Sequence, residues 1–190
     1  MDNAVTLLPP AFSLMVGHLS EATRDLFAEL DLRVSLHPTA AEQAHPESTE
    51  AAGMAVIGYA GAGVRGALVM VVEERAIVTW MEAVGVPDGE VADTLGEFSN
   101  MLLGRLKERL LPLGISIIAT TPTAAIGRGF RLSESPGPSS WASFHGPGWN
   151  LRVRLDASFE AGFRVAERPL AWQPKAGDVI DFDAFEARDK

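Results

Sequence analysis

Glu97 and Asn100 stand three positions apart in a stretch whose apolar residues recur with helical spacing. With about 100° between successive residues of a helix, the apolar side chains fall on one side: Val91, Leu95, Phe98, Leu102, Leu106 and Leu110. The row on the opposite side consists of Asp93, Glu97, Asn100, Gly104 and Lys107. Residues three or four apart on a helix are neighbours. We therefore predict that a carboxylate and an amide share one exposed face of a helix from about Glu90 to Leu111.

Such a face is often no more than a solvated helix surface. Two of its residues are unusual for that purpose, because the side chain of Asn100 competes for backbone hydrogen bonds and Gly104 costs about 1 kcal/mol relative to alanine in a helix interior. Both residues are reasonable if the face must approach another molecule closely. Taken alone, the residues leave a solvated face and a contact face as alternatives.

The spacing of Asp93, Glu97, Asn100 and Pro122 resembles the signature of the CheC/CheX/FliY family of chemotaxis phosphatases. That signature reads Asp or Ser, three residues, Glu, two residues, Asn, twenty-one residues, Pro, and every spacing fits. The run from Gly96 to Gly104 and the Thr-Pro before Gly127 also resemble family sequences. The likeness extends over roughly residues 12–165, and the single Glu/Asn pair is more similar to CheX than to CheC. Ser99 and Arg105-Leu106 depart from the usual pattern; Arg105 falls beside the buried stripe, where it would alter packing more than chemistry.

The resemblance implies an enzyme that hydrolyses the aspartyl phosphate of a CheY-like response regulator. Asn100 would orient the attacking water and Glu97 would pair with the regulator's active-site lysine. Asp93, Gly104 and Lys107 would lie against the partner, with Asp93 also favouring the first turn of the helix. Pro122 would end a strand. No cofactor of its own is implied, since Mg²⁺ would belong to the regulator. The alternative is a non-catalytic binding module in a two-component or flagellar signalling complex.

The remaining pattern predicts an α+β domain, with a mainly antiparallel sheet packed against two long helices and one short helix, over residues 8–167. Helices are expected at 12–30, 73–84 and 90–111. Strands are expected near 32–36, 54–60, 67–72, 115–119, 140–144, 149–155 and 162–165. Gly61 to Gly66 matches the G-x-G-x-x-G dinucleotide motif. The residues that follow are β-branched and apolar rather than helical, so a hairpin turn is predicted instead.

Composition narrows the classes of partner. The 190 residues carry a formal net charge of −9 and contain no cysteine, which disfavours nucleic acid and anionic membranes and excludes thiolate metal sites. The four histidines lack metal-ligand spacing, so no metal site is expected. Without a secretory signal in Met1 to Pro10, a cytoplasmic location is expected. A homodimer is expected only because CheX-like proteins pair.

Residues 168–190 form an acidic and hydrophobic C-terminal tail beyond the predicted domain. Such a segment resembles peptide tethers that bind response regulators and raise their local concentration. The alternative is a tail that packs on its own domain or has no fixed structure. Trp172, between two prolines, could dock the tail, whereas Trp80 and Trp149 lie in apolar patterns and are predicted to be core residues.

Overall fold

The structure, a computed structural model, describes residues 9–32, 34–37, 52–85 and 90–166. Its central element is a long hairpin of β2 (Ala52–Gly61) and β3 (Val64–Glu73), paired from Ala52 opposite Glu73 to Gly61 opposite Val64. The turn needs a left-handed residue, which Gly63 supplies with φ 72°. The Gly-rich motif is therefore a hairpin turn, as predicted.

A seven-stranded sheet is built outward from this hairpin, in the order β1-β6-β7-β3-β2-β4, with β5 also paired to β2. Its other strands are β1 (Ser35–His37), β4 (Ile117–Ala119), β5 (Thr123–Gly127), β6 (Ser139–Gly146) and β7 (Trp149–Phe159). Every pairing is antiparallel. The α+β class and the mainly antiparallel sheet are therefore confirmed.

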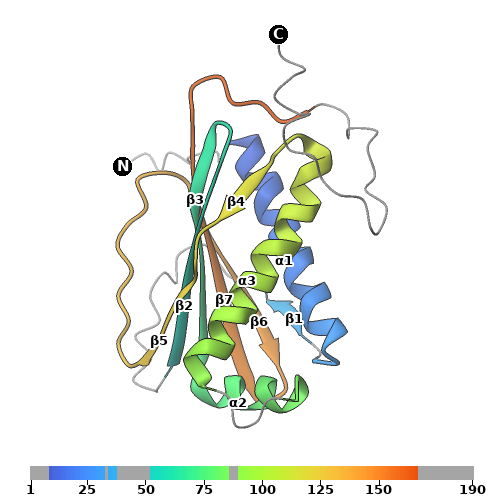
Figure 1. Ribbon diagram of the computed structural model, residues 1–190, viewed down its shortest axis with the longest axis vertical. Coiled ribbons are helices and arrows are strands. Elements are labelled where there is room, and N and C mark those ends of the chain that lie inside the picture. The colour runs from blue at the N-terminus through green and yellow to red at the C-terminus, as the bar shows by residue number, and fades with distance from the viewer. Residues whose placement is uncertain (1–8, 33, 38–51, 86–89, 167–190) are drawn as a thin grey trace, which may run out of the picture.

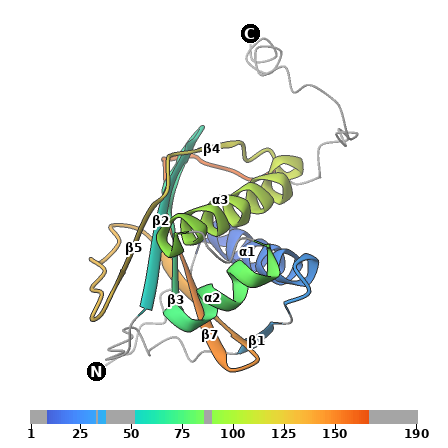
Figure 2. The same cartoon turned by 60° about the horizontal axis from the view of Figure 1, so that its bottom comes forward.

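The helices are α1 (Pro10–Glu29), α2 (Glu74–Ala83) and α3 (Val91–Leu110), followed by a 3₁₀ turn, Leu111–Leu113. Figure 2 shows α1 and α3 on the same side of the sheet, with the short α2 at one end. Each long helix turns an apolar stripe toward the sheet. On α1 this stripe includes Phe12, Met15, Leu19 and Leu26. Pro112 and the left-handed Gly114, at φ 76°, terminate the third helix. All three helices are where the sequence predicts them.

Two expectations about strands fail. The sequence predicts no strand after Pro122, yet Thr123–Gly127 pairs with Ala52–Val56 of β2; its residues are small and largely exposed, so only the neighbouring strand defines it. The expected strand at 162–165 is wrong. After Glu160 the chain turns through Gly162, which has φ 89°, and the Ala166 N–H donates to the Leu113 carbonyl instead of joining the sheet.

Four aromatic residues join the layers at the centre of the core. Phe27 of α1 lies 4.8 Å from Trp80 of α2 and 6.0 Å from Phe98 of α3, measured between ring centroids. Trp149 of β7 lies 5.4 Å from Trp80. All four are buried, which confirms that Trp80 and Trp149 are core residues.

Among the described residues, no helix is both long and apolar enough to cross a bilayer. The predicted C-terminal tail, with Trp172, lies outside the described residues.

Candidate functional site

The helix α3 places its polar row away from the core. Leu95, Phe98 and Leu102 are at most 2% exposed, and Leu106 and Leu110 continue the same buried stripe. The predicted helical phase is therefore confirmed. Val91, at the start of this stripe, is half-buried.

Glu97 and Asn100 are both exposed, as are Asp93 one turn before them and Gly104 one turn after. Among the described residues, neither the Glu97 carboxylate nor the Asn100 amide takes part in a hydrogen bond or an ion pair. Polar side chains held on a rigid helix without an internal partner are available to another molecule.

An open groove of about 660 Å³ runs beside this part of the helix. One wall is α3, with Asp93, Gly96, Glu97 and Asn100. The other wall is the edge of the sheet, formed by Ala119, Thr120, Thr121, Pro122 and Ala124. The structure thus brings together the predicted residues Asp93, Glu97, Asn100 and Pro122, although Pro122 follows Asn100 by more than twenty positions in the sequence.

Gly96 and Pro122 lie close together, one on each wall of the groove. A β-carbon added to Gly96 would lie 3.7 Å from Cγ of Pro122, at ordinary van der Waals distance. The helix can therefore lie directly against the proline ring. Pro122 itself lies between β4, which ends at Ala119, and β5, which begins at Thr123.

The sheet-edge wall is tied to β2 between its two short strands. The Gly58 N–H donates to Oγ1 of Thr120 at 3.0 Å, and the Thr120 N–H donates to the Gly58 carbonyl at 2.9 Å. A side chain at position 58 would press on Thr120, since an added β-carbon lies 3.1 Å from that hydroxyl oxygen. The Thr120 hydroxyl is therefore engaged in holding the wall.

Two of the residues predicted to contact a partner lie outside the groove lining. Gly104 is exposed, and a β-carbon added there would meet no atom within 4 Å. Lys107 is half-buried and has an interaction within the chain, so it is not a free cation. The sequence analysis did not identify Thr120 and Thr121 as members of the site. The Thr-Pro pair in the motif was the signal that could have found them.

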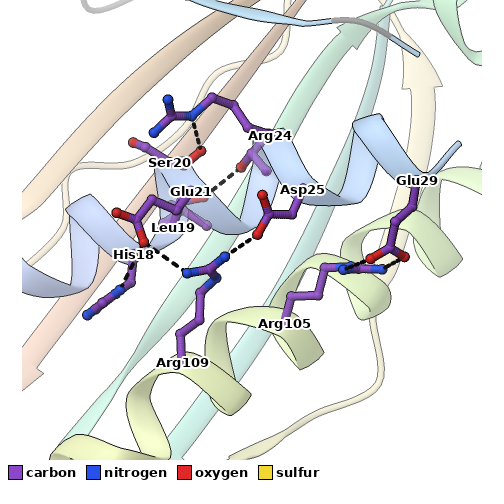
Figure 3. A network of polar contacts seen from close by, with 10 residues as sticks. His18, Leu19, Ser20, Glu21, Arg24, Asp25, Glu29, Arg105 and Arg109 are labelled. Atoms are coloured by element: carbon purple, nitrogen blue, oxygen red, sulfur yellow. Dashed lines mark hydrogen bonds and ion pairs between the residues drawn. The ribbon is translucent and has the colours of Figure 1, made fainter. Parts of the chain in front are cut away.

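Arginines on the other side of α3 are directed to α1, away from the groove. Figure 3 shows Arg105 against Glu29, and Arg109 between Glu21 and Asp25. Hydrogen bonding from Arg105 lowers the pKa of Glu29 below its ordinary value. Arg105 therefore links α3 to α1, in keeping with its predicted position beside the buried stripe. Because it points away from the groove, the groove keeps the acidic character of Asp93 and Glu97.

Ser99, the other departure from the family pattern, lies beneath the exposed row. Its side chain is fully buried, and its hydroxyl donates to the Gly96 carbonyl at 2.7 Å. The polar group is satisfied within the helix, so the substitution leaves the exposed face unchanged.

Fold and site together define the class of protein: an antiparallel α+β domain whose long helix presents a carboxylate and an amide beside an open groove. Residues 54–145 match the family model described as Chemotaxis phosphatase CheX. This match covers 92 of the 190 residues and supports an assignment to the CheC/CheX/FliY family, close to CheX. No curated protein matches the sequence.

Three solved structures illustrate the shared fold. CheX from Vibrio vulnificus is 20% identical with a TM-score of 0.64, over 76% of this chain and 96% of that chain. A CheX in a CheX–CheY–BeF₃–Mg²⁺ complex from Borrelia burgdorferi is 16% identical with a TM-score of 0.57, over 77% and 96%. FliY from Thermotoga maritima is 16% identical with a TM-score of 0.55, over 80% and 93%.

Proposed function

We propose that this protein accelerates hydrolysis of the aspartyl phosphate of a CheY-like response regulator. The observation that carries the proposal is the pair formed by Glu97 and Asn100, exposed and without an internal partner on the groove side of α3. The match of residues 54–145 to a family described as chemotaxis phosphatases supports the same reaction. The complex of the Borrelia burgdorferi CheX with CheY supports a partner of that kind.

In the proposed reaction, water attacks phosphorus and the bond from phosphorus to the aspartyl oxygen breaks. The products are the free aspartate carboxylate and inorganic phosphate, which carries both protons of the water. An acyl phosphate has a good leaving group, so positioning the water is the main task left to the enzyme. The Asn100 amide is uncharged and can approach the anionic phosphoryl group, and its carbonyl oxygen accepts a hydrogen bond from the water.

Glu97 has a docking role in this proposal. Its carboxylate pairs with the active-site lysine of the regulator, which fixes the register of the two proteins and brings Asn100 to the phosphoryl group. Mg²⁺ is held by the regulator, whose own residues bind it. The bare surface at Gly104 leaves room for the partner next to Asn100.

The test is the rate at which a phosphorylated CheY-like regulator loses phosphate, measured above its own spontaneous rate. A panel of regulators should contain at least one that the wild-type protein dephosphorylates. Asn100→Ala should lower kcat on the order of 100-fold, because a misplaced nucleophile has about that effect. Glu97→Gln should raise KM roughly 10-fold or more, since one partner of a buried charge pair is removed.

Matched controls lie outside the groove. Asn150→Ala, at an exposed asparagine of β7, and Glu82→Gln, at an exposed carboxylate of α2, should leave both constants unchanged. A wild-type rate in Asn100→Ala would eliminate the proposed mechanism. Tight binding to regulators without any turnover would favour the non-catalytic module.

A further inference from the structure

Besides Asp93, Glu97 and Asn100, the groove has a fourth polar side chain without a partner among the described residues, the hydroxyl group of Thr121. Thr121 is exposed and lines the sheet-edge wall. Within the described residues its hydroxyl takes part in no hydrogen bond, unlike that of Thr120, which binds the Gly58 N–H. Thr120 is thus occupied by the fold, and Thr121 presents a free hydroxyl on the wall opposite Asn100.

The geometry of the two walls places Thr121 between the levels of Gly96 and Asn100. Only residues 114–116 separate the 3₁₀ turn after α3 from β4, so the chain turns back and descends beside the helix (Figure 1). Gly96 and Pro122 mark where the walls meet. From Gly96 to Asn100 the helix rises about 6 Å. The same distance along an extended chain is about two residues, so Thr121, one residue before Pro122, lies between the levels of Gly96 and Asn100.

A water molecule that attacks phosphorus must present a lone pair to it. Both of its O–H bonds must then point to acceptors on the side away from phosphorus. The Asn100 carbonyl oxygen is one acceptor, and it leaves the second O–H bond without a partner on the helix. An acceptor on the other wall would fix the water by two hydrogen bonds rather than one, which restricts its rotation as well as its position.

We propose that the Thr121 hydroxyl oxygen accepts this second hydrogen bond, so that the attacking water is held between the helix and the sheet edge. This role rests on the proposed phosphatase activity and adds a residue to its machinery. The hydroxyl proton of Thr121 is left to donate to a phosphoryl oxygen. No additional reactant is needed, because the bonds made and broken are those of the same hydrolysis.

The test compares Thr121→Val with Thr121→Ser in the full chain, against a phosphorylated regulator that the wild type dephosphorylates. Valine keeps the shape and removes the hydroxyl. We expect kcat to fall about 3- to 10-fold, the effect of one hydrogen bond, with KM unchanged. Serine should restore kcat. Thr123→Val is the control, because Thr123 is exposed on β5 but does not line the groove.

The outcomes separate this inference from the proposed function. If Asn100→Ala is impaired and Thr121→Val has wild-type kcat, the water is not held by Thr121 and the inference fails alone. A rise in KM without a change in kcat also overturns it, because the side chain then serves docking only. A wild-type protein without activity on any regulator overturns both. Equal thermal melting of the wild type and Thr121→Val would show that a fall in kcat does not come from unfolding.

Discussion

Near the middle of α3, Gly104 leaves the helix surface bare beside the two residues of the proposed site. A β-carbon there would meet no atom of the protein within 4 Å, so packing within the chain does not require glycine. Glycine in a helix interior is nevertheless unfavourable. A partner that must approach the backbone closely would account for a residue that the fold itself disfavours.

Gly104→Ala should therefore stabilise the protein and weaken docking. We expect the free energy of unfolding to rise by about 1 kcal/mol from helix propensity, and KM for the phosphorylated regulator to increase. Gly17→Ala is the matched control, because Gly17 lies inside α1 with the same open surroundings. It should give the stability gain alone. Denaturant unfolding and steady-state kinetics measure the two effects, and an unchanged KM in Gly104→Ala would contradict a docking role.

The sequence is informative about residues on α3 and uninformative about those across the groove. Helical periodicity alone separates Leu95 and Phe98 from Glu97 and Asn100, because both sets belong to one regular element. Thr121 has no such local signal. Its place in the groove lining depends on the pairing of β4 and β5 with β2, which joins residues about sixty positions apart or more.

At the scale of elements, α3 is held to α1 by a line of ion pairs as well as by the core. Arg105 makes two hydrogen bonds to the Glu29 carboxylate, and Arg109 contacts Glu21 and Asp25 (Figure 3). These contacts lie at the surface, where single ion pairs contribute little. They hold the side of α3 that carries Arg105 and Arg109 against α1, while Glu97 and Asn100 lie on the groove side of the same helix.

The Glu29 contact predicts a dependence of stability on acid. Because the pKa of Glu29 is lower in the folded protein than its ordinary value of 4.5, its contribution is present above that value and is lost as pH falls through the folded pKa. Glu29→Gln should destabilise the protein slightly at pH 7 and not at strongly acid pH. Urea unfolding at several pH values measures the difference, and 1 M salt should reduce it.

The control for this prediction is Glu82→Gln, at an exposed carboxylate of α2 without an ion pair among the described residues. Its effect on stability should not vary with pH. If the effect of Glu29→Gln were the same at pH 7 and at acid pH, the ion pair with Arg105 would have no energetic role.

Helices and strands whose own residue pattern determines them could be predicted from the sequence. Strands that form only because a neighbouring strand pairs with them could not. The helices α1, α2 and α3 and the hairpin β2–β3 follow from periodicity and from Gly63. By contrast, β5 is a strand only because β2 offers it hydrogen bonds. Gly162 to Val165 is apolar enough for a strand but is diverted by the turn after Glu160 and the bond to Leu113. Sequence order likewise does not determine the order of strands in the sheet.

At the scale of the whole molecule, one aromatic cluster joins every layer on which the groove depends. The cluster takes one ring from each of α1, α2, α3 and β7, namely Phe27, Trp80, Phe98 and Trp149. The centroids of the rings that are in contact lie 4.8 to 6.0 Å apart. Phe98 follows Glu97 directly in the sequence. The position of the helix face that carries Glu97 and Asn100 therefore depends on the same contacts that stabilise the fold.

Phe27→Ala should accordingly lower the free energy of unfolding of the domain, and the domain should still unfold in a single transition. Loss of a buried phenylalanine costs about 3–5 kcal/mol, and Phe27 is fully buried among three other rings. Near-UV circular dichroism, which reports the packing of Trp80 and Trp149, and far-UV circular dichroism should change together during denaturant unfolding. Phe163→Ala, at a half-buried ring against Phe159, should cost less. Separate transitions would show that α3 is anchored independently of this cluster.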